Sequence, residues 1–352
     1  MKHFFWVLLL ILLVFRFFST RPDYKEGDRV RISSKVTSEP VRYSDAQGIT
    51  LEGLRFYLPY YPQIYYGDKI VVEGEVEDVK LKDPYLVSVE PSKSLLPKIR
   101  KRIVGFYHAS IPEPHSSLVA GMTLGSKASI PQHFWELLKK SGTAHVVVAS
   151  GMNVTLVASF LMTLLVAVVP RRKAVIFALA GIWLYALISG FDAPIIRAAI
   201  MGSIAFSALV LGRLNYAWRG LFLSAYLMLI IKPDWIKDLG FILSFVATAS
   251  LMLFEKRVRK IVSFVPGIFR EGLSTSLAAQ IGVAPILYYT FNSFNILSPV
   301  INALVLWTVS PITVIGMISA LLSYISIYLG RLVLYLVYPL TWWFEFVVIQ
   351  AG

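Results

Sequence analysis

Cysteine is absent from this chain of 352 residues. Its absence excludes disulfide bonds, thiolate nucleophiles and cysteine-ligated zinc sites. Charged residues are scarce as well, at 16% of the chain, whereas soluble domains average about 25%. No Gly-x-x-x-x-Gly-Lys-[Ser/Thr] motif occurs, so the chain offers no P-loop for nucleotide hydrolysis.

Apolar residues dominate instead. They make up 56% of the chain, the mean hydropathy is +0.65, and several apolar runs are long enough to cross a bilayer. The sequence therefore predicts a polytopic α-helical membrane protein.

The first residues predict a membrane anchor. Residues 4–15 are continuously apolar, and Arg16 follows them. Because no small-x-small cleavage site comes next, we expect residues 1–20 to remain as an uncleaved transmembrane anchor. Arg16 would then reach the membrane interface.

Residues 21–94 predict a small β-domain. Apolar and polar residues alternate over residues 30–36, 48–58 and 69–77, and a further apolar run covers residues 85–89. Four or five short strands within about 75 residues are typical of an OB-like β-barrel.

OB-like barrels often bind single-stranded nucleic acid through aromatic side chains and a basic groove. Aromatic residues are plentiful in this segment: Tyr43, Phe56, Tyr57, Tyr60, Tyr61, Tyr65 and Tyr66. Its net charge is −2, so a basic groove is not evident. The alternative is that the aromatic residues form a core, a docking surface or a membrane-facing patch.

Residues 95–141 predict amphipathic helices at the membrane interface. Arg100, Lys101 and Arg102 are interleaved with apolar residues, as in an interfacial helix. Residues 134–140 are similar, with Pro131 before them and Gly142 after them. The three cations are also candidates for attracting DNA at the outer face.

Residues 142–352 predict the polytopic membrane domain. Outside residues 21–94 the chain carries a net charge of +15. Placing the basic loops in the cytoplasm gives one consistent topology, with the helix of His145 starting outside and the OB-like domain extracytoplasmic. The same charge would attract a polyanion such as nucleic acid, although composition alone favours the topological explanation.

Residues 143–155 place polar side chains at the start of an apolar run that continues to Val169. In an unbroken helix, Asn153 lies about 80° and Ser150 about 140° from His145. The three then share one broad face, and polar groups in hydrocarbon need partners or a water-filled cavity. They are candidates for lining a pore, and tight helix packing at Ser150 is the alternative. The angle also argues against His145 acting as a general base on Ser150 in a protease.

Arg197 lies within the apolar run of residues 194–211. An arginine there is costly to bury and points to function. It is a candidate for binding DNA phosphate or for closing a gate with Asp192. A snorkelling side chain or a structural ion pair is the alternative.

Asn295 and Asn302 lie in a region where prolines interrupt the apolar runs. Broken helices with polar side chains usually line a cavity or pathway, so both asparagines are pore-lining candidates. Ordinary kinks with locally satisfied amides are the alternative. The prolines are Pro285, Pro299 and Pro311.

In order and spacing, these segments resemble the ComEC family of competence proteins, over nearly the whole chain. The stretches that carry the resemblance are Gly142-Thr-Ala-His145, Ser150-Gly-Met-Asn153, Arg197-Ala-Ala-Ile-Met201, residues 240–248 and residues 292–311. The resemblance implies an inner-membrane DNA uptake channel. Its partners would be single-stranded DNA, a DNA receptor outside and a helicase-like ATPase inside.

Two departures from the family pattern matter. The second signature histidine is Asn153 here, which argues against any mechanism that needs two histidines. Many family members continue into a metallo-β-lactamase-like domain, but this chain has no His-x-His-x-Asp-His motif. Nuclease activity is therefore not carried over.

The sequence thus predicts an inner-membrane channel that passes single-stranded DNA into the cytoplasm during natural transformation. A cytoplasmic motor or a proton gradient would supply the energy, and we expect no enzymatic activity, cofactor or metal. Membrane lipid is a further partner, and homo-oligomerisation stays open. The alternatives are a secondary transporter, a lipid or polysaccharide exporter, or a non-conducting scaffold. The apolar end at Gly352 resembles that of a shortened chain.

Overall fold

The computed structural model describes residues 12, 14–17, 19, 25–43, 45–77, 80–128, 130–148, 150–210, 217–291 and 295–352. Most of the predicted anchor, residues 1–20, lies outside the described residues. The chain forms two compact units. The first comprises Met1–Ser94 and Phe191–Ile242, and the second comprises Leu95–Gly190 and Leu243–Gly352.

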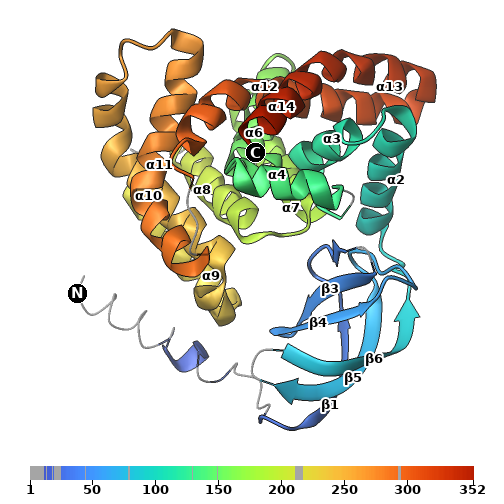
Figure 1. Ribbon diagram of the computed structural model, residues 1–352. Coiled ribbons are helices and arrows are strands. Elements are labelled where there is room, and N and C mark those ends of the chain that lie inside the picture. Colours follow the sequence, from blue (N-terminus) through green and yellow to red (C-terminus); the bar gives the residue numbers. More distant parts are fainter. Residues whose placement is uncertain are drawn as a thin grey trace. The chain divides into compact units, whose positions relative to one another are not determined.

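The first unit contains a six-stranded mixed sheet (Figure 1). The strand order is β1-β5-β6-β4-β3-β2, and β4 pairs with β6 in parallel through Arg55 and Lys80. The ladders among the described strands leave β1 and β2 at the two ends, so a closed barrel is not shown. The OB-like topology stays a prediction. The strands are β1 (Arg29–Lys35), β2 (Val41–Arg42), β3 (Ala46–Leu51), β4 (Leu54–Pro59), β5 (Lys69–Glu77) and β6 (Lys80–Glu90).

The alternating run of residues 48–58 forms a hairpin rather than one strand. β3 and β4 join at Glu52 and Gly53, with Leu51 opposite Leu54. Both turn residues have positive φ, +45° and +86°. This is the two-residue turn that matches the twist of paired strands, and glycine supplies its second position without strain.

Alternation along the strands separates a core face from an outer face. Phe56 and Leu58 are buried in the core, whereas Tyr57 between them is 59% exposed. On β6, Tyr85 is 70% exposed and lies opposite Glu73. The outer face of the sheet therefore carries exposed aromatic rings.

After Gly190, the described residues of the first unit form mainly apolar helices. They form α8 (Ala193–Val210), α9 (Ala217–Ile231), the short η1 (Pro233–Lys237) and the first residues of α10 (Leu239–Ile261).

The second unit is entirely helical in its described residues. In chain order, beside most of α10, its elements are α2 (Leu95–Ser110), α3 (His115–Leu124), α4 (Gln132–Lys140), α5 (Ala144–Val147), α6 (Gly151–Val166), α7 (Arg171–Ser189), α11 (Gly267–Phe291), α12 (Ser298–Ile325), α13 (Ile327–Leu334), η2 (Tyr335–Val337) and α14 (Tyr338–Ala351).

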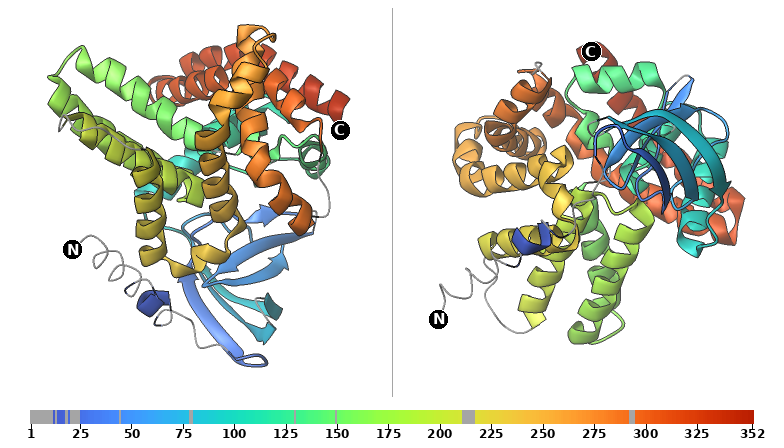
Figure 2. Two further views of the ribbon diagram at one scale, coloured as in Figure 1. Left: turned by 90° about the vertical axis from the view of Figure 1, so that its left-hand side faces the viewer. Right: turned by 90° about the horizontal axis from the view of Figure 1, so that it is seen from below.

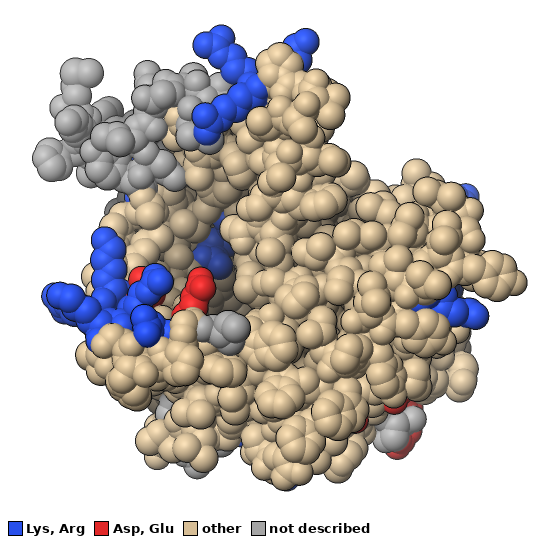
Figure 3. All heavy atoms as spheres, turned by 90° about the horizontal axis from the view of Figure 1, so that it is seen from above, with Lys and Arg blue, Asp and Glu red and all other residues tan. Residues whose placement is uncertain are grey.

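Five helical segments among the described residues are long and apolar enough to cross a membrane. This fits the predicted multi-pass membrane protein. The face drawn in Figure 3 accordingly consists mostly of uncharged residues, with Lys and Arg in a few small groups. The segments are Ala144–Val166, Arg171–Ser189, Leu239–Ile261, Ser298–Ile325 and Ile327–Ala351.

Helices α6 and α7 lie side by side (Figure 2). Their approach is close at Gly181, where an added Cβ would lie 2.2 Å from Cδ1 of Leu161. A glycine at this point lets the two apolar helices pack tightly, as small residues do between membrane helices.

Helix α3 is buried along its whole length. All ten of its residues are buried, and it packs against α2, α5, α12 and α14. It lies within the segment 95–141, for which the sequence predicted interfacial helices. The difference arises because α3 contains serine, alanine and glycine, which allow close contact on every side.

Candidate functional site at the two ends of a buried helix

The C-terminal end of α3 collects side-chain donors from several helices. The last carbonyl groups of a helix lack partners within it and must find them elsewhere when they are buried. Asn153 of α6 donates from Nδ2 to the carbonyl oxygen of Met122 across 2.6 Å. Thr313 of α12 donates to the same oxygen across 3.4 Å, and Tyr185 of α7 donates to Thr123 across 3.0 Å.

Backbone N–H groups satisfy further carbonyl groups at this end of α3. Gly125 has a φ of +71°, and its N–H donates to Gly121 across 2.8 Å. Ser126 donates to the carbonyl oxygen of Ala120 across 3.3 Å. This left-handed glycine cap turns the chain away, so the final carbonyls of α3 face polar side chains inside an apolar bundle.

Arg100 is buried at this same end, which corrects its predicted place on the outer face. Its Nη1 donates to the carbonyl oxygen of Leu124 across 2.6 Å and to that of Ile188 across 2.8 Å. It thus joins the C-terminal ends of α3 and α7, where the helix dipole favours a cation. A side chain that is 4% exposed is not available to attract DNA.

Residues 143–155 do not form the unbroken helix on which the angles between His145, Ser150 and Asn153 depend. Val148 and Ser150 have extended backbones, with ψ of 141° and 177°, and they separate α5 from α6. Ser150 caps α6 by accepting from the Met152 N–H across 3.3 Å. The angles expected for a single helix therefore do not apply. His145 on α5 is exposed, whereas Asn153 is 1% exposed.

A second polar group lies between α11 and α12. Asn302, which is 1% exposed, donates to the hydroxyl oxygens of Ser276 across 3.0 Å and of Ser298 across 3.3 Å. Gln280 also donates to Ser298, across 2.9 Å. Gly142 has a φ of +74°, and an added Cβ would lie 2.6 Å from Ser298. The signature turn at Gly142 thus packs against the polar start of α12.

The structure places the other predicted site residues in different environments. Asn295 donates to the carbonyl oxygen of Lys140 across 2.7 Å and accepts from the Leu297 N–H across 2.8 Å, so it helps to start α12. Lys101 and Arg102 are exposed, and Arg102 lies 4.2 Å above the ring of Tyr324.

Arg197 and Asp192 belong to the first unit. Arg197 is half-buried in α8. Asp192 lies just before that helix, and its carbonyl oxygen accepts from the N–H groups of Ile195 and Ile196. The gate that these two side chains would form stays a prediction.

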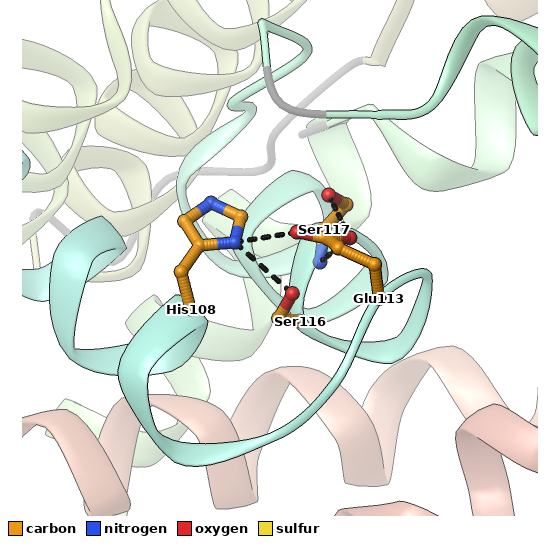
Figure 4. A network of polar contacts seen from close by, with 4 residues as sticks. All are labelled: His108, Glu113, Ser116 and Ser117. Atoms are coloured by element: carbon orange, nitrogen blue, oxygen red, sulfur yellow. Dashed lines mark hydrogen bonds and ion pairs between the residues drawn. The ribbon is translucent and has the colours of Figure 1, made fainter.

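Sequence reasoning missed a titratable cluster at the N-terminal end of α3, drawn in Figure 4. His108 Nδ1 lies 2.6 Å from Glu113 Oε1 and 3.0 Å from Ser116 Oγ. The second carboxylate oxygen of Glu113 accepts from the N–H and the hydroxyl of Ser117. Burial raises the pKa of Glu113, but the hydrogen bonds from His108 and Ser117 outweigh it and hold that pKa below its usual range.

His115 extends this cluster to α14. Its Nε2 lies 3.5 Å from Glu345 Oε2, and its ring centroid lies 4.5 Å from that of Tyr338. Burial lowers the pKa of His115, and the charges of Glu345 and Glu113 partly offset that effect.

The cluster is not a catalytic triad, because Ser116 and Glu113 both contact the same nitrogen of His108. A triad needs the serine and the carboxylate on opposite nitrogens of the imidazole. Nor do three or more His, Asp or Glu side chains among the described residues converge as a metal site would require. The sequence held one signal for this cluster: Arg331 and Glu345 are the only charged residues after Glu271.

Comparison with known proteins identifies the family. The family model described as "Competence protein" matches residues 122–351, from the last turn of α3 to the end of α14. ComE operon protein 3 of Bacillus subtilis (strain 168) is 28% identical over 208 residues, which is 58% of this chain and 26% of that protein. Competence protein ComA of Neisseria gonorrhoeae is 27% identical over 218 residues, which is 56% of this chain and 30% of that protein.

A third relative gives no further information about function. An uncharacterized protein of Aquifex aeolicus (strain VF5) is 28% identical over 204 residues, 58% of this chain and 46% of that protein. This chain therefore spans less than half the length of these relatives, and no solved structure gives a significant match. Because the family model covers well over half of the chain, including the five candidate membrane spans among the described residues, the chain belongs to the ComEC family of competence proteins.

Proposed function

We propose that this protein is an inner-membrane component of DNA uptake during natural transformation, and that it passes one strand of DNA into the cytoplasm. The observation that carries the proposal is the family match over residues 122–351. The matched relatives are named as competence proteins.

Charge placement supports a polyanion as the cargo. Arg197 lies in an apolar helix, where a guanidinium is expected to serve a function, and its planar fork suits phosphate. Lys101 and Arg102 are exposed on α2 and would attract DNA as it approaches. Arg100 is left out of this role because it is buried.

The sheet would offer an aromatic surface to DNA. Tyr43 and Tyr57 meet edge to face with centroids 5.8 Å apart, and an added Cβ on Gly48 would lie 3.3 Å from both rings. Exposed rings of this kind stack on bases without sequence preference. We place this OB-like domain outside the cell, where it would guide a strand before passage.

In this proposal the protein moves DNA and does not cleave it. An external DNA receptor would deliver the substrate, and a helicase-like ATPase or a proton gradient would drive it. A path that fits one strand and excludes a duplex would then enforce strand selection.

The test is a gene deletion in the host, followed by labelled duplex DNA and complementation. We expect the deletion strain to bind DNA at its surface but to accumulate no cytoplasmic single strand. The wild-type gene should restore uptake, Arg197→Ala should not, and Arg197→Lys should restore it in part because the charge remains. Unchanged uptake in the deletion strain would overturn the proposal and favour a secondary transporter or an exporter.

A further inference from the structure

Arg331 and Glu345, the two isolated charges of the C-terminal region, lie in the apolar segment Ile327–Ala351. Charged side chains in such a segment are costly, and residues of this kind commonly mark ion or proton pathways. The residues around Arg331 and Glu345 therefore bear on what these two charges do.

Both residues face the cluster at the start of α3. Glu345 approaches His115, as described above, and Arg331 Nη2 donates to the carbonyl oxygen of Ala109 across 3.4 Å. Ala109 follows His108 directly. The cluster therefore contains two imidazoles, two carboxylates and one guanidinium from α2, the α2–α3 turn, α3, α13 and α14.

The other elements packed against α3 do not change the charge of this cluster. Helix α12 contains no charged residue and no histidine. On α2, Arg100 binds the opposite end of α3, and the buried Tyr107 donates to the carbonyl oxygen of Gly316 across 2.9 Å. The other titratable groups on these helices are the exposed Lys98, Lys101 and Arg102 of α2, Tyr324 of α12 and the exposed His145 of α5. Tyr338 of α14 packs against His115 with its ring tilted by 56°.

Charge balance then favours the uptake of a proton. With both imidazoles neutral, two carboxylates and one guanidinium leave one net negative charge. His115 is the buried member of the cluster, whereas the side chains of His108, Glu113 and Glu345 are 27%, 40% and 21% exposed. A neighbouring negative charge favours the cationic form of an imidazole, and one proton on an imidazole neutralises the cluster. His115 is 5% exposed, and its Nδ1 has no hydrogen-bond partner in the part of the chain that the structure describes.

We propose that His108, Glu113, His115 and Glu345 form a proton-binding site that takes up and releases one proton. In uptake, an O–H bond of a hydronium ion breaks as an N–H bond forms on a ring nitrogen of His115, leaving water, and Glu345 stabilises the resulting imidazolium. Release of the proton reverses this exchange. The proposal does not require DNA as the cargo, so it can fail or succeed independently of the proposed function.

The test is a titration of the full-length protein in lipid nanodiscs, with ¹⁵N-labelled histidine followed by NMR. We expect the His115 signal to change from its cationic to its neutral form as the pH is raised from the acid to the neutral range, because burial lowers its pKa. In Glu345→Gln the midpoint should fall by about one pH unit or more, because a nearby carboxylate favours the imidazolium. His133, exposed on α4, is the internal control, and its signal should be the same in the wild type and in the variant.

Two results would overturn the proposal. One is a wild-type His115 signal that stays in a single form across this range, a measurement that needs no variant. The other is a His115 midpoint that Glu345→Gln leaves unchanged. If Glu345→Gln does not fold, Glu113→Gln provides a second comparison for His115, whose midpoint should fall because the charge of Glu113 also favours its cationic form.

Discussion

Asn153 and Thr313 donate to one acceptor, the carbonyl oxygen of Met122. The shared bond links α6 and α12 through the end of α3. Replacing Asn153 with leucine removes the shorter of the two bonds and leaves a buried acceptor poorly satisfied. We expect the free energy of unfolding to fall by about 1–3 kcal/mol, measured by chemical denaturation in detergent.

The control for this substitution is Thr155→Val on the same helix. Thr155 is exposed and bonds only to the Met152 carbonyl of its own turn, so its replacement should change stability by less than about 0.5 kcal/mol. Equal effects of the two variants would contradict the role given to Asn153.

Gly142→Ala should destabilise the protein for two reasons. The residue has a positive φ, and the new Cβ would collide with Ser298. The left-handed backbone alone costs about 1–2 kcal/mol for a residue with a side chain. Gly105→Ala on α2 is the matched control, since nothing lies within 4 Å of the added atom. It should gain about 0.5–1 kcal/mol, and a Gly142→Ala variant as stable as Gly105→Ala would refute the packing argument.

Arg100 and Lys101 should differ although they are neighbours. Arg100→Ala removes a buried cation that bonds to two helix ends, and we expect stability to fall by about 1.5–3 kcal/mol. Lys101→Ala should leave stability nearly unchanged but weaken the binding of single-stranded DNA, with a smaller dependence on salt. Fluorescence anisotropy of labelled DNA at several salt concentrations measures the second effect. Weaker DNA binding by a well-folded Arg100→Ala variant would contradict this assignment and support a role for Arg100 in attracting DNA.

The Glu113 carboxyl should make stability depend on pH in the acid range. Its pKa is lower in the folded protein than the usual glutamate value, which is about 4.3. Its contribution is therefore present above that value and is lost as the pH falls through the lower folded pKa. Glu113→Gln should make the melting temperature decline less steeply below about pH 4. Glu136→Gln, exposed on α4, should keep the wild-type slope, and parallel curves for all three proteins would exclude this contribution.

Tyr57 should contribute to DNA binding through its ring rather than its hydroxyl. Tyr57→Ala is expected to weaken binding of single-stranded DNA to the full-length protein by about 1–3 kcal/mol. Tyr57→Phe keeps the ring and should retain most of the affinity. If both variants bind as tightly as the wild type, the outer face of the sheet is not part of the DNA path.

Local sequence patterns predicted those strands and helices that depend on residues close to one another in the chain. The alternation of residues 69–77 gave the bounds of β5 (Lys69–Glu77), and Pro131 and Gly142 bracket α4 (Gln132–Lys140). The break at Val148 and Ser150 was missed because neither residue is a helix breaker of the glycine or proline type. Ser150 instead caps the start of α6 through its hydroxyl.

The contacts between residues far apart in the chain could not be predicted from the sequence, for a related reason. A helical period assigns Arg100 to a face, but it does not tell which partner covers that face. The approach of His115 to Glu345 depends on how α14 packs against α3, and no local signal links these distant residues. The one available signal was compositional, since two isolated charges in an apolar region must have partners.

The burial of α3 also constrains how the protein is made. This helix leaves the ribosome before α6, α7, α12 and α14, all of which supply side chains that contact it. Until the last of them has been synthesised, α3 lacks the contacts that satisfy its two ends. We therefore expect the membrane insertion machinery or a chaperone to hold α3 until α14 arrives, and a ribosome stalled before Tyr338 to leave a nascent chain that proteases recognise.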